Sequence, residues 1–424
     1  MASAYLSRTP ASASNRDLWT LSFWIKRSTL GTSQSIYGVY ADSNNQETLA
    51  FDSNDKLYWQ LYQSGGVVGQ LTTNRLFRDT SAWYHIVVAY DSANSTAGNR
   101  MRMYINGVEE TSFATDTNPS SGQDSQWNST TAHTIGRINT TNYFDGSITH
   151  FHSIDGTAYT PSAFGQSDSN GVWIPKPSPS VTYGTNGFFL KMDNSGNMGL
   201  DSGGGSNNFT TSGTITQAKD TPSNVFATLN PLSSLAILTT GNTTATTTDS
   251  TWRPGSTTIG MLGTTGKYYA EFKVISGNNN YVGVYNLNTN FGTSQSTADA
   301  NRIAYSTYDG EIMRTLTGES TITGLATSGS SDVVGIAINK NDGEVKFYKN
   351  GTLIQTVSHS NITNYDLMIG CQVGYTSSSC FNFGNGYFGT TAVTSAGTNA
   401  SGNGIFEYDV PTGYTALSTK GLNS

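Results

Sequence analysis

The sequence predicts an all-β protein with two jelly-roll β-sandwich domains in tandem, and a repeated hairpin is the main reason. In residues 100–105 apolar and polar side chains alternate, as in a strand with one buried face. Asn106-Gly107 follows at once, and both residues tolerate the positive φ of a two-residue hairpin turn. Because the same pattern returns at residues 344–349 and Asn350-Gly351, we expect one sandwich for each copy.

Length and composition are the second and third observations. A chain of 424 residues exceeds one ordinary core, so two or three domains are expected. Charged residues are 12%, about half of the usual share, and the polarity comes from Ser, Thr, Asn and 46 Gly. Thr and the 23 Tyr suit half-exposed strands, while Gly, Asn and Ser suit the turns between them.

The charge pattern excludes several partners. The net charge is −7 without a basic cluster, so we expect no nucleic-acid binding. No apolar stretch approaches the roughly 20 residues of a membrane helix, so we expect no membrane insertion. Residues 1–17 are polar and lack the apolar core of a signal peptide, which predicts synthesis in a cytoplasm. The surface composition nevertheless resembles that of an extracellular protein, and a virion component released by lysis reconciles the two.

Two cysteines, Cys371 and Cys380, have no His or Cys partners at the spacing of a zinc site. We expect two reduced thiols, because the chain is expected to be made in a reducing cytoplasm. A disulfide across adjacent strands is left open.

The first domain is expected over residues 1–170. Residues 5–10 predict an edge strand that ends at a proline, which cannot donate to a ladder. In residues 18–27 the side chains of Trp19 and Phe23 point inward, and Trp24 falls on the outward face and needs cover from elsewhere. The further strands are expected at residues 35–42, 47–52, 56–62, 66–72, 83–91 and 133–138, and the domain is expected to end with residues 144–165.

Three segments carry a resemblance to a known family: residues 18–27, residues 83–110 with the first hairpin, and the closing residues 146–165. In this order and spacing they resemble the laminin-G-like, concanavalin-type jelly roll. The resemblance covers about residues 1–170 and implies a lectin-like sandwich.

Residues 171–224 are expected to be a connector. Three prolines within residues 175–179 favour a stiff extended segment, and residues 203–205 are three glycines in a row. Residues 188–190 are expected to form a strand docked on one of the sandwiches. The runs 201–208 and 220–224 are similar to inserts found between such domains in marine bacteriophage virion proteins.

The second domain is expected over residues 225–424. The strand 268–274, residues 282–284 and 334–336, the second hairpin and the run Asn382-Phe383-Gly384 resemble a SPRY-type sandwich. The tail at residues 411–419 is similar to an ending common in phage proteins of this kind.

Catalytic and metal motifs are weak. The Glu-x-Asp-x-x-Glu strand of jelly-roll glucanases, which supplies the two carboxyls of retaining cleavage, does not occur. His150 and His152 are two apart on a strand but lack a clear third ligand, so ordinary strand residues are favoured. Rim aspartates Asp42, Asp145 and Asp155 are only weak candidates for calcium. We therefore expect no enzyme activity, no cofactor and no metal.

Sugar binding is the remaining specific hypothesis. Aromatic rings stack on the apolar faces of sugars while amides and carboxylates bind the hydroxyl groups. Trp127 lies in a loop of Gly, Gln, Asp, Ser and Asn, where a large ring is either a binding contact or a plug. Tyr143, Trp59 and Tyr62 are further glycan-contact candidates, although alternating strand aromatics are more often core.

Together these observations predict a non-enzymatic bacteriophage virion surface protein, such as a capsid decoration, head fibre or tail-associated protein. Its partners would be other virion proteins and a host-surface glycan, with several copies arranged by particle symmetry. The alternatives are a phage polysaccharide depolymerase and a bacterial carbohydrate-binding adhesin. The sequence leaves open the capsid or tail location, the glycan, the oligomeric state and the docking face.

Overall fold

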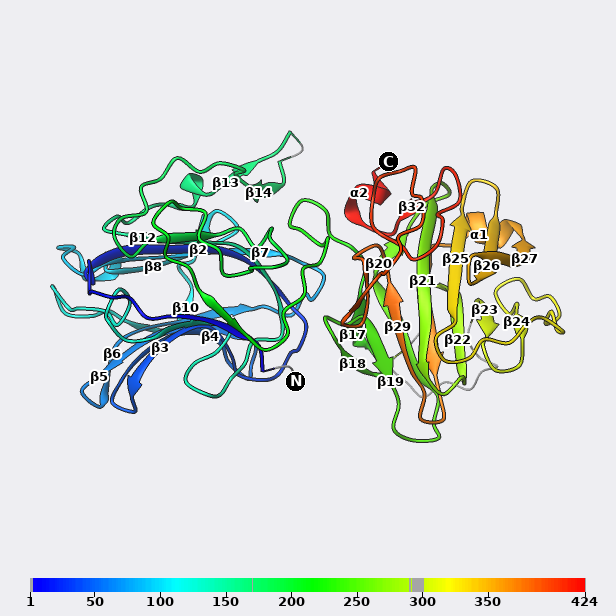
Figure 1. The fold of residues 1–424 in the computed structure, drawn as a ribbon, viewed down its shortest axis with the longest axis horizontal. Helices are drawn as coiled ribbons and strands as arrows, with labels where there is room; N and C mark the ends of the chain where they lie inside the picture. Colours follow the sequence, from blue (N-terminus) through cyan, green and yellow to red (C-terminus); the bar gives the residue numbers. More distant parts are fainter. Residues whose placement is uncertain (1–2, 170, 290, 292–300, 424) are drawn as a thin grey trace. The chain divides into compact units, whose positions relative to one another are not determined.

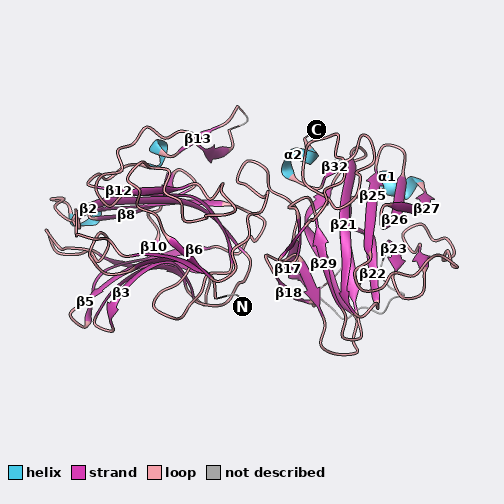
Figure 2. Cartoon of the chain, viewed as in Figure 1, coloured by secondary structure: helices cyan, strands magenta, loops and turns pink. Residues whose placement is uncertain are grey.

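A computed structural model describes residues 3–169, 171–289, 291 and 301–423. The chain forms two compact units, Met1–Gln217 and Ala218–Ser424. Each unit contains two large β-sheets that face each other across an apolar core, as predicted (Figure 1). Helical structure is limited to short single turns in the described residues (Figure 2).

In its described residues, the first unit is a sandwich of two antiparallel sheets. The larger sheet has the strand order β10-β6-β5-β4-β3-β11-β1-β16. Its strands are β1 Tyr5–Arg8, β3 Gln34–Asp42, β4 Asn45–Phe51, β5 Lys56–Gln63, β6 Gly66–Leu76, β10 Phe113–Thr117, β11 His133–Ile135 and β16 Thr210–Ser212. The smaller sheet has the order β15-β12-β2-β7-β8-β9. Its strands are β2 Leu18–Arg27, β7 Tyr84–Asp91, β8 Met101–Ile105, β9 Val108–Glu109, β12 Gly146–Asp155 and β15 Phe188–Leu190.

The predicted alternation defines the core of this unit. Trp19, Leu21, Phe23 and Ile25 on β2 are completely buried between the sheets. On β8 the side chains of Met101, Met103 and Ile105 face the same core. Asn106 and Gly107 have φ of 50° and 84°, which confirms the predicted hairpin turn.

The prediction that residues 5–10 form an edge strand is wrong. β1 pairs with β11 on one side and with β16 on the other. The second partner comes from residues 171–217, which were expected to be a connector and instead pack as part of the first unit. Residues 188–190 form a docked strand, β15, which extends the smaller sheet beside β12.

Residues 156–169 and 171–183, together called the cover segment, lie against the outer face of the smaller sheet. It contains η2 Pro161–Ala163 and the small sheet of β13 Gly165–Ser167 with β14 Trp173–Pro175. Phe164 packs on Val87, Tyr104 and Ile154 of the sheet. The outward Trp24 is 3% exposed and stacks on His85, whose Nδ1 accepts a hydrogen bond from the Trp173 indole. The cover that Trp24 needed is therefore supplied from later in the chain.

The second unit is also a sandwich of two sheets in its described residues. One sheet has the order β17-β20-β28-β22-β23-β24. Its strands are β17 Leu229–Ser234, β20 Arg253–Met261, β22 Asn280–Asn286, β23 Arg302–Ser306, β24 Glu311–Met313 and β28 Leu367–Val373. The other has the order β18-β19-β29-β21-β25-β26-β27, with β32 pairing β21 in parallel. Its strands are β18 Ile237–Thr239, β19 Thr244–Thr246, β21 Lys267–Ser276, β25 Val333–Asn339, β26 Glu344–Lys349, β27 Thr352–Ser358, β29 Ser378–Asn382 and β32 Thr415–Ala416. The remaining elements of the chain are η1 Ala97–Asn99, β30 Tyr387–Phe388, β31 Thr391–Ala392, α1 Ser360–Asn364 and α2 Thr419–Leu422.

Residues 398–418, the tail segment, cover the outer face of the second of these sheets. Phe406 and Tyr414 pack with Tyr269 on the outer face of β21, and all three are buried. Val225, which directly follows the run 220–224, meets Thr419, the last residue of the run 411–419. Val225 donates its N–H to the Thr419 hydroxyl, and Thr419 donates its N–H to the Val225 carbonyl. These runs therefore close the second unit structurally.

Each sandwich buries one glutamate that accepts hydrogen bonds from a crossing loop. In the first unit Glu47 is 0% exposed and accepts from the Trp59 indole (3.0 Å), Gln126 N (2.8 Å) and Trp127 N (3.2 Å). Burial raises the pKa of Glu47 to about 7, although these hydrogen bonds act in the opposite direction.

Glu271 has the same role in the second unit. It is 0% exposed and accepts from Glu407 N and Tyr408 N, both at 2.8 Å, so it holds the tail segment on β21. Burial raises its pKa to about 7. Cys371 on β28 and Cys380 on β29 are buried free thiols in different sheets, and burial raises the pKa of both to about 12.

Among the described residues, the structure has no helix whose length and apolar character would allow it to cross a bilayer.

The two units are predicted to respond oppositely to pH between 7 and 5. In the second unit Glu271 keeps its proton up to about pH 7 when folded, whereas an unfolded glutamate loses it near 4.5. Lowering the pH therefore favours the folded unit, by at most about 1.4 kcal/mol per pH unit.

In the first unit four histidines outweigh Glu47. Burial lowers the pKa of His85 and His133 to about 3 and also lowers those of His150 and His152. Because these side chains take up protons below 6.5 only when unfolded, lowering the pH destabilises this unit. Urea unfolding of the full chain at pH 7, 6 and 5, read by pulsed hydrogen-exchange mass spectrometry, resolves the two units. Midpoints that move in the same direction would contradict the prediction.

Candidate functional site

The structure does not bring the four predicted glycan contacts together on one surface. Trp59 and Trp127 are both 0% exposed and belong to the core of the first unit, so neither can touch a ligand from solvent. Tyr62 is partly exposed, and its hydroxyl donates to the Gly65 carbonyl within a hairpin. Tyr143 is partly exposed in a stack with Arg137 and Tyr5.

The expectation that Trp127 is a binding contact is corrected by the way its loop folds. Glu47 accepts the backbone N–H groups of Gln126 and Trp127, which draws the loop inward over the edge of the sandwich. The indole then packs edge-on against Tyr37, with 3.9 Å between ring centroids, and donates to Ser153 Oγ at 2.9 Å. Trp127 is thus an internal plug, the other reading of a large ring in a polar loop.

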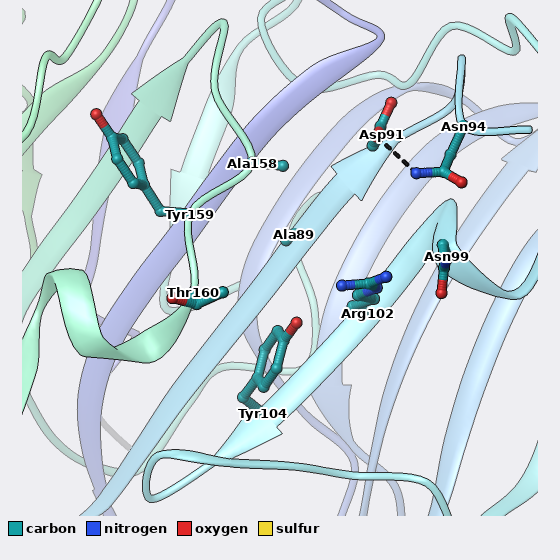
Figure 3. A pocket seen from close by; sticks show the side chains of 9 residues that line it. All are labelled: Ala89, Asp91, Asn94, Asn99, Arg102, Tyr104, Ala158, Tyr159 and Thr160. Atoms are coloured by element: carbon teal, nitrogen blue, oxygen red, sulfur yellow. Dashed lines mark hydrogen bonds between the residues drawn. The ribbon is translucent and has the colours of Figure 1, made fainter. Parts of the chain in front are cut away.

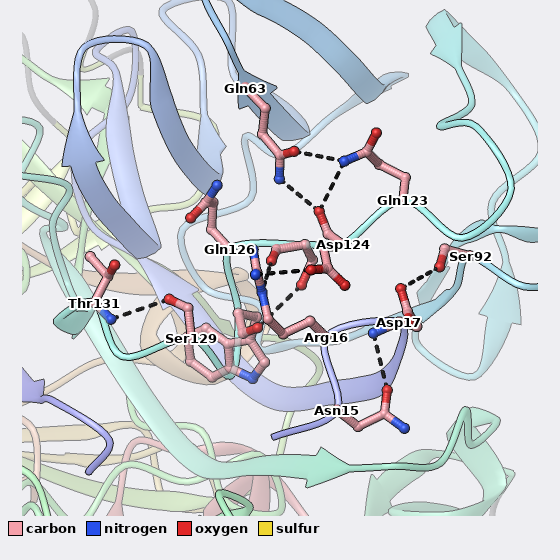
Figure 4. Close-up of polar contacts among 12 residues, drawn as sticks. Asn15, Arg16, Asp17, Gln63, Ser92, Gln123, Asp124, Gln126, Ser129 and Thr131 are labelled. Carbon is pink, nitrogen blue, oxygen red and sulfur yellow. Dashed lines mark hydrogen bonds and ion pairs between the residues drawn. The ribbon is translucent and has the colours of Figure 1, made fainter. Parts of the chain in front are cut away.

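The polar groups of the same loop are bound to one another, as Figure 4 shows. Arg16 forms an ion pair with Asp124 at 2.9 Å and donates from Nε to the Ser125 carbonyl. Gln63 donates to the Asp124 carbonyl at 2.7 Å and accepts from Gln123 at 2.7 Å. This network holds the loop that carries Trp127, so its side chains are engaged in structure.

The weak metal candidates also have structural roles. The Asp155 carboxylate is 8% exposed and accepts from Asn15 N and Asn186 N, while Asp145 accepts from the Thr29 hydroxyl. His150 has φ of 49° at an irregularity of β12, so it and His152 do not alternate regularly. Within the described ranges, no group of three or more His, Cys, Asp or Glu side chains could hold a metal ion.

A cleft of about 160 Å³ opens on the outer face of the smaller sheet, beside the cover segment (Figure 3). Its floor comes from Ala89 and Asp91 on β7 and from Arg102 and Tyr104 on β8. The walls come from Asn94, Asn99 and the cover residues Ala158, Tyr159 and Thr160. Sequence reasoning missed this site, because its two sides lie far apart in the chain and only the packing of Phe164 places them together.

The cleft is lined by tyrosine side chains, by amide groups and by one anionic and one cationic side chain. Tyr159 is partly exposed at its wall and Tyr104 is 6% exposed at its floor, while Asp91 accepts from Asn94 Nδ2 at 3.0 Å. Arg102 is cationic, and a hydrogen bond with Tyr104 raises its pKa further. Its Nε is buried, and the Glu109 oxygen 3.8 Å away is too distant for a hydrogen bond.

The size of the cleft limits its ligand. Its volume is about half of the roughly 300 Å³ at which drug-sized pockets begin. Rings, amides, a carboxylate and a guanidinium around such a space suit one sugar unit of a longer chain. Asp91 is the one carboxylate among the lining residues, whereas glycoside hydrolysis uses two.

The role of Glu47 is testable by stability. Glu47→Ala leaves three buried N–H donors without their acceptor, so we expect the first unit to lose at least about 3 kcal/mol of unfolding free energy. The measurement is urea unfolding followed by tryptophan fluorescence. Glu109→Ala is the control, because this exposed side chain makes only a long surface pair worth at most about 1 kcal/mol. Equal effects of the two variants would contradict the assigned role.

Comparisons with known proteins agree with the fold. The laminin G model described as the concanavalin A-like lectin/glucanases superfamily matches residues 2–155, and the SPRY domain model matches residues 267–386. No curated protein matches the chain.

Similar solved structures include the SPRY domain of human HERC1, with 18% identity over 36% of this chain and 96% of that one and a TM-score of 0.31. A heptameric SAP-like pentraxin from Limulus polyphemus is 17% identical over 38% of this chain and 73% of that one, with a TM-score of 0.29. Domains LG4-5 of the mouse laminin alpha1 chain are 11% identical over 96% of this chain and 92% of that one, with a TM-score of 0.30.

These structural likenesses are weak, and the domain assignment rests on the two family models. Both kinds of domain indicate a binding or adhesion module. The chain therefore carries a concanavalin A-like domain of the laminin G type followed by a SPRY domain.

Proposed function

We propose that this chain is a non-enzymatic surface protein of a bacteriophage particle and that it binds a glycan through the cleft of its first domain. The observation that carries the glycan proposal is the cleft between β7, β8 and the cover segment. It is lined by the partly exposed Tyr159 and the largely buried Tyr104, together with Arg102, Asp91 and two asparagines. This combination supports recognition of a sugar that has both an apolar face and hydroxyl groups.

A binding function is favoured over polysaccharide cleavage. The cleft offers the single carboxylate of Asp91, which already accepts a hydrogen bond from Asn94. A second carboxyl at catalytic distance would be required for acid–base hydrolysis.

The phage proposal has a separate and weaker support. It rests on the similarity of residues 201–208, 220–224 and 411–419 to runs in phage virion proteins. These runs have structural roles here. Asp201, for example, accepts from Phe189 N and Gly203 N and so fixes the docked strand β15. They therefore support a shared architecture and leave the place on the particle open.

The glycan proposal predicts a loss of binding when a cleft ring is removed. Tyr159→Ala deletes a partly exposed ring of the cover segment, so we expect binding to fall by about tenfold or more, as for a central aromatic contact. The measurement is a glycan array of host capsule and lipopolysaccharide fragments probed with the full chain. Tyr62→Ala is the matched control, since Tyr62 lies outside the cleft and its removal should leave binding unchanged. Reversed effects of the two variants would assign the contact to Tyr62 instead.

The virion proposal predicts that the protein is a constituent of purified particles. Mass spectrometry of gradient-purified virions should find peptides of both domains at a copy number that fits the symmetry of a capsid or tail. Its absence from particles, together with its presence on a bacterial surface, would favour the adhesin alternative.

A further inference from the structure

The turn between β28 and β29 has an unusual composition for its backbone. Tyr375 and Thr376 have φ of 52° and 61°, and Ser377 donates its N–H to the Gly374 carbonyl at 3.2 Å. Positive φ at both central residues, with this hydrogen bond, is the geometry of a type I′ turn, which here links strands of two different sheets. Such turns favour Asn and Gly, because an L-residue with a Cβ is strained there.

Other turns of this chain follow that preference. Asn106-Gly107, Asn350-Gly351 and Ser64-Gly65 all have positive φ at both positions, and each places glycine second. The β28–β29 turn instead uses an aromatic residue followed by a β-branched one, two types that rarely adopt this conformation. An Asn-Gly or Ser-Gly pair would form this turn with less backbone strain than Tyr375-Thr376. The strained pair therefore needs an explanation other than folding stability.

The strain holds Tyr375 at an exposed aromatic corner, formed by Trp252, Tyr281 and Tyr375. The Tyr375 ring is 50% exposed and stands edge-on to Trp252, with 5.6 Å between centroids and an interplanar angle of 87°. Trp252 packs in turn on Tyr281 at 5.2 Å. A Cβ on Gly374 would meet the Trp252 ring at 2.7 Å, so glycine is required there for the indole to lie on the turn.

The surroundings are polar and nearly neutral. The Asp249 carboxylate beside Trp252 is paired with Arg253, and Thr376 donates its N–H to the Asp249 carbonyl at 3.1 Å. The partly exposed Asn279 is tied to the turn through its backbone, since Gly374 N donates to its carbonyl at 2.9 Å. The Arg302 guanidinium lies 4.5 Å from the Tyr281 ring centroid, and the carboxylates of Glu311 and Asp309 also interact with this tyrosine, so charges of both signs border the rings.

We propose that the aromatic corner of the second domain is a binding site for a neutral saccharide and that the strained turn persists because it presents Tyr375. Two rings at a right angle offer a floor and a wall to the apolar face of a sugar. The bordering amide and hydroxyl groups suit its hydroxyls. This site is separate from the cleft of the first domain and does not depend on the function proposed for that cleft.

The experiment uses the full chain labelled with 5-fluorotryptophan and a panel of neutral hexasaccharides, namely cello-, malto-, laminari-, manno- and chitohexaose. Trp252 is the single tryptophan of residues 218–424, so its fluorine resonance reports this corner and is assigned by its loss in Trp252→Phe. We expect at least one hexasaccharide to shift that resonance in a saturable manner. Absence of a shift with every member of the panel would overturn the proposal.

Two variants separate binding from strain. Tyr375→Asn should weaken the titration by about tenfold or more, because it removes the wall of the corner. Thr376→Gly keeps Tyr375 and relaxes the turn, so it should leave the titration unchanged. It should also raise the midpoint of thermal loss of the folded Trp252 resonance by roughly 2–4 °C.

Wild-type affinity in Tyr375→Asn, or lost affinity in Thr376→Gly, would contradict the role given to Tyr375. Tyr159→Ala in the first domain should leave the Trp252 response unchanged, which keeps a failure at this corner distinct from a failure at the cleft.

Discussion

Both sandwiches depend on covering a sheet face that is too apolar to meet water. In the first unit Val87, Tyr104 and Ile154 lie on the outer face of the smaller sheet, and the cover segment buries them. In the second unit residues 398–418 bury Tyr269 and Ala337 in the same way. A sheet with two apolar faces needs a third layer, and each unit builds that layer from a late segment of its chain, after β12 in the first unit and after β31 in the second. The cleft of the first domain lies beside residues 158–160 of this layer. Covering the apolar sheet face therefore also creates the candidate site.

A buried carboxylate stabilises the attachment of a crossing loop in each unit. A loop brought onto a sheet carries backbone N–H groups that need acceptors. Glu47 supplies them to Gln126 and Trp127, and Glu271 supplies them to Glu407 and Tyr408. The cost of burying these carboxyls appears as their raised pKa values. In the first unit this bonding places Trp127 inside the core, so loop polarity alone was a poor guide to a binding surface.

Aromatic residues serve two purposes in this protein, and exposure separates them. Trp19, Trp59 and Trp127 form one buried group in the first core. Tyr159 at the cleft and Tyr375 at the aromatic corner remain accessible, and each has polar neighbours that suit a sugar. Of the predicted contacts, Trp59 and Trp127 failed because a strand or loop pattern does not reveal what packs on it. The cleft could not be predicted, since its walls come from residues 89–104 and 158–160 and no local motif joins them.

By itself the sequence determined the all-β class, the two sandwiches, the core faces of β2, β8, β21 and β26, and both Asn-Gly hairpins. These features follow from side-chain alternation and local turn chemistry, which act over a few residues. The tertiary structure decided that residues 171–217 complete the first unit, that β1 is an interior strand, and that Glu47 and Glu271 are buried. It also decided which aromatic rings stay in contact with solvent. Those outcomes depend on pairing between segments far apart in the chain, where burial and backbone hydrogen bonding outweigh local preference.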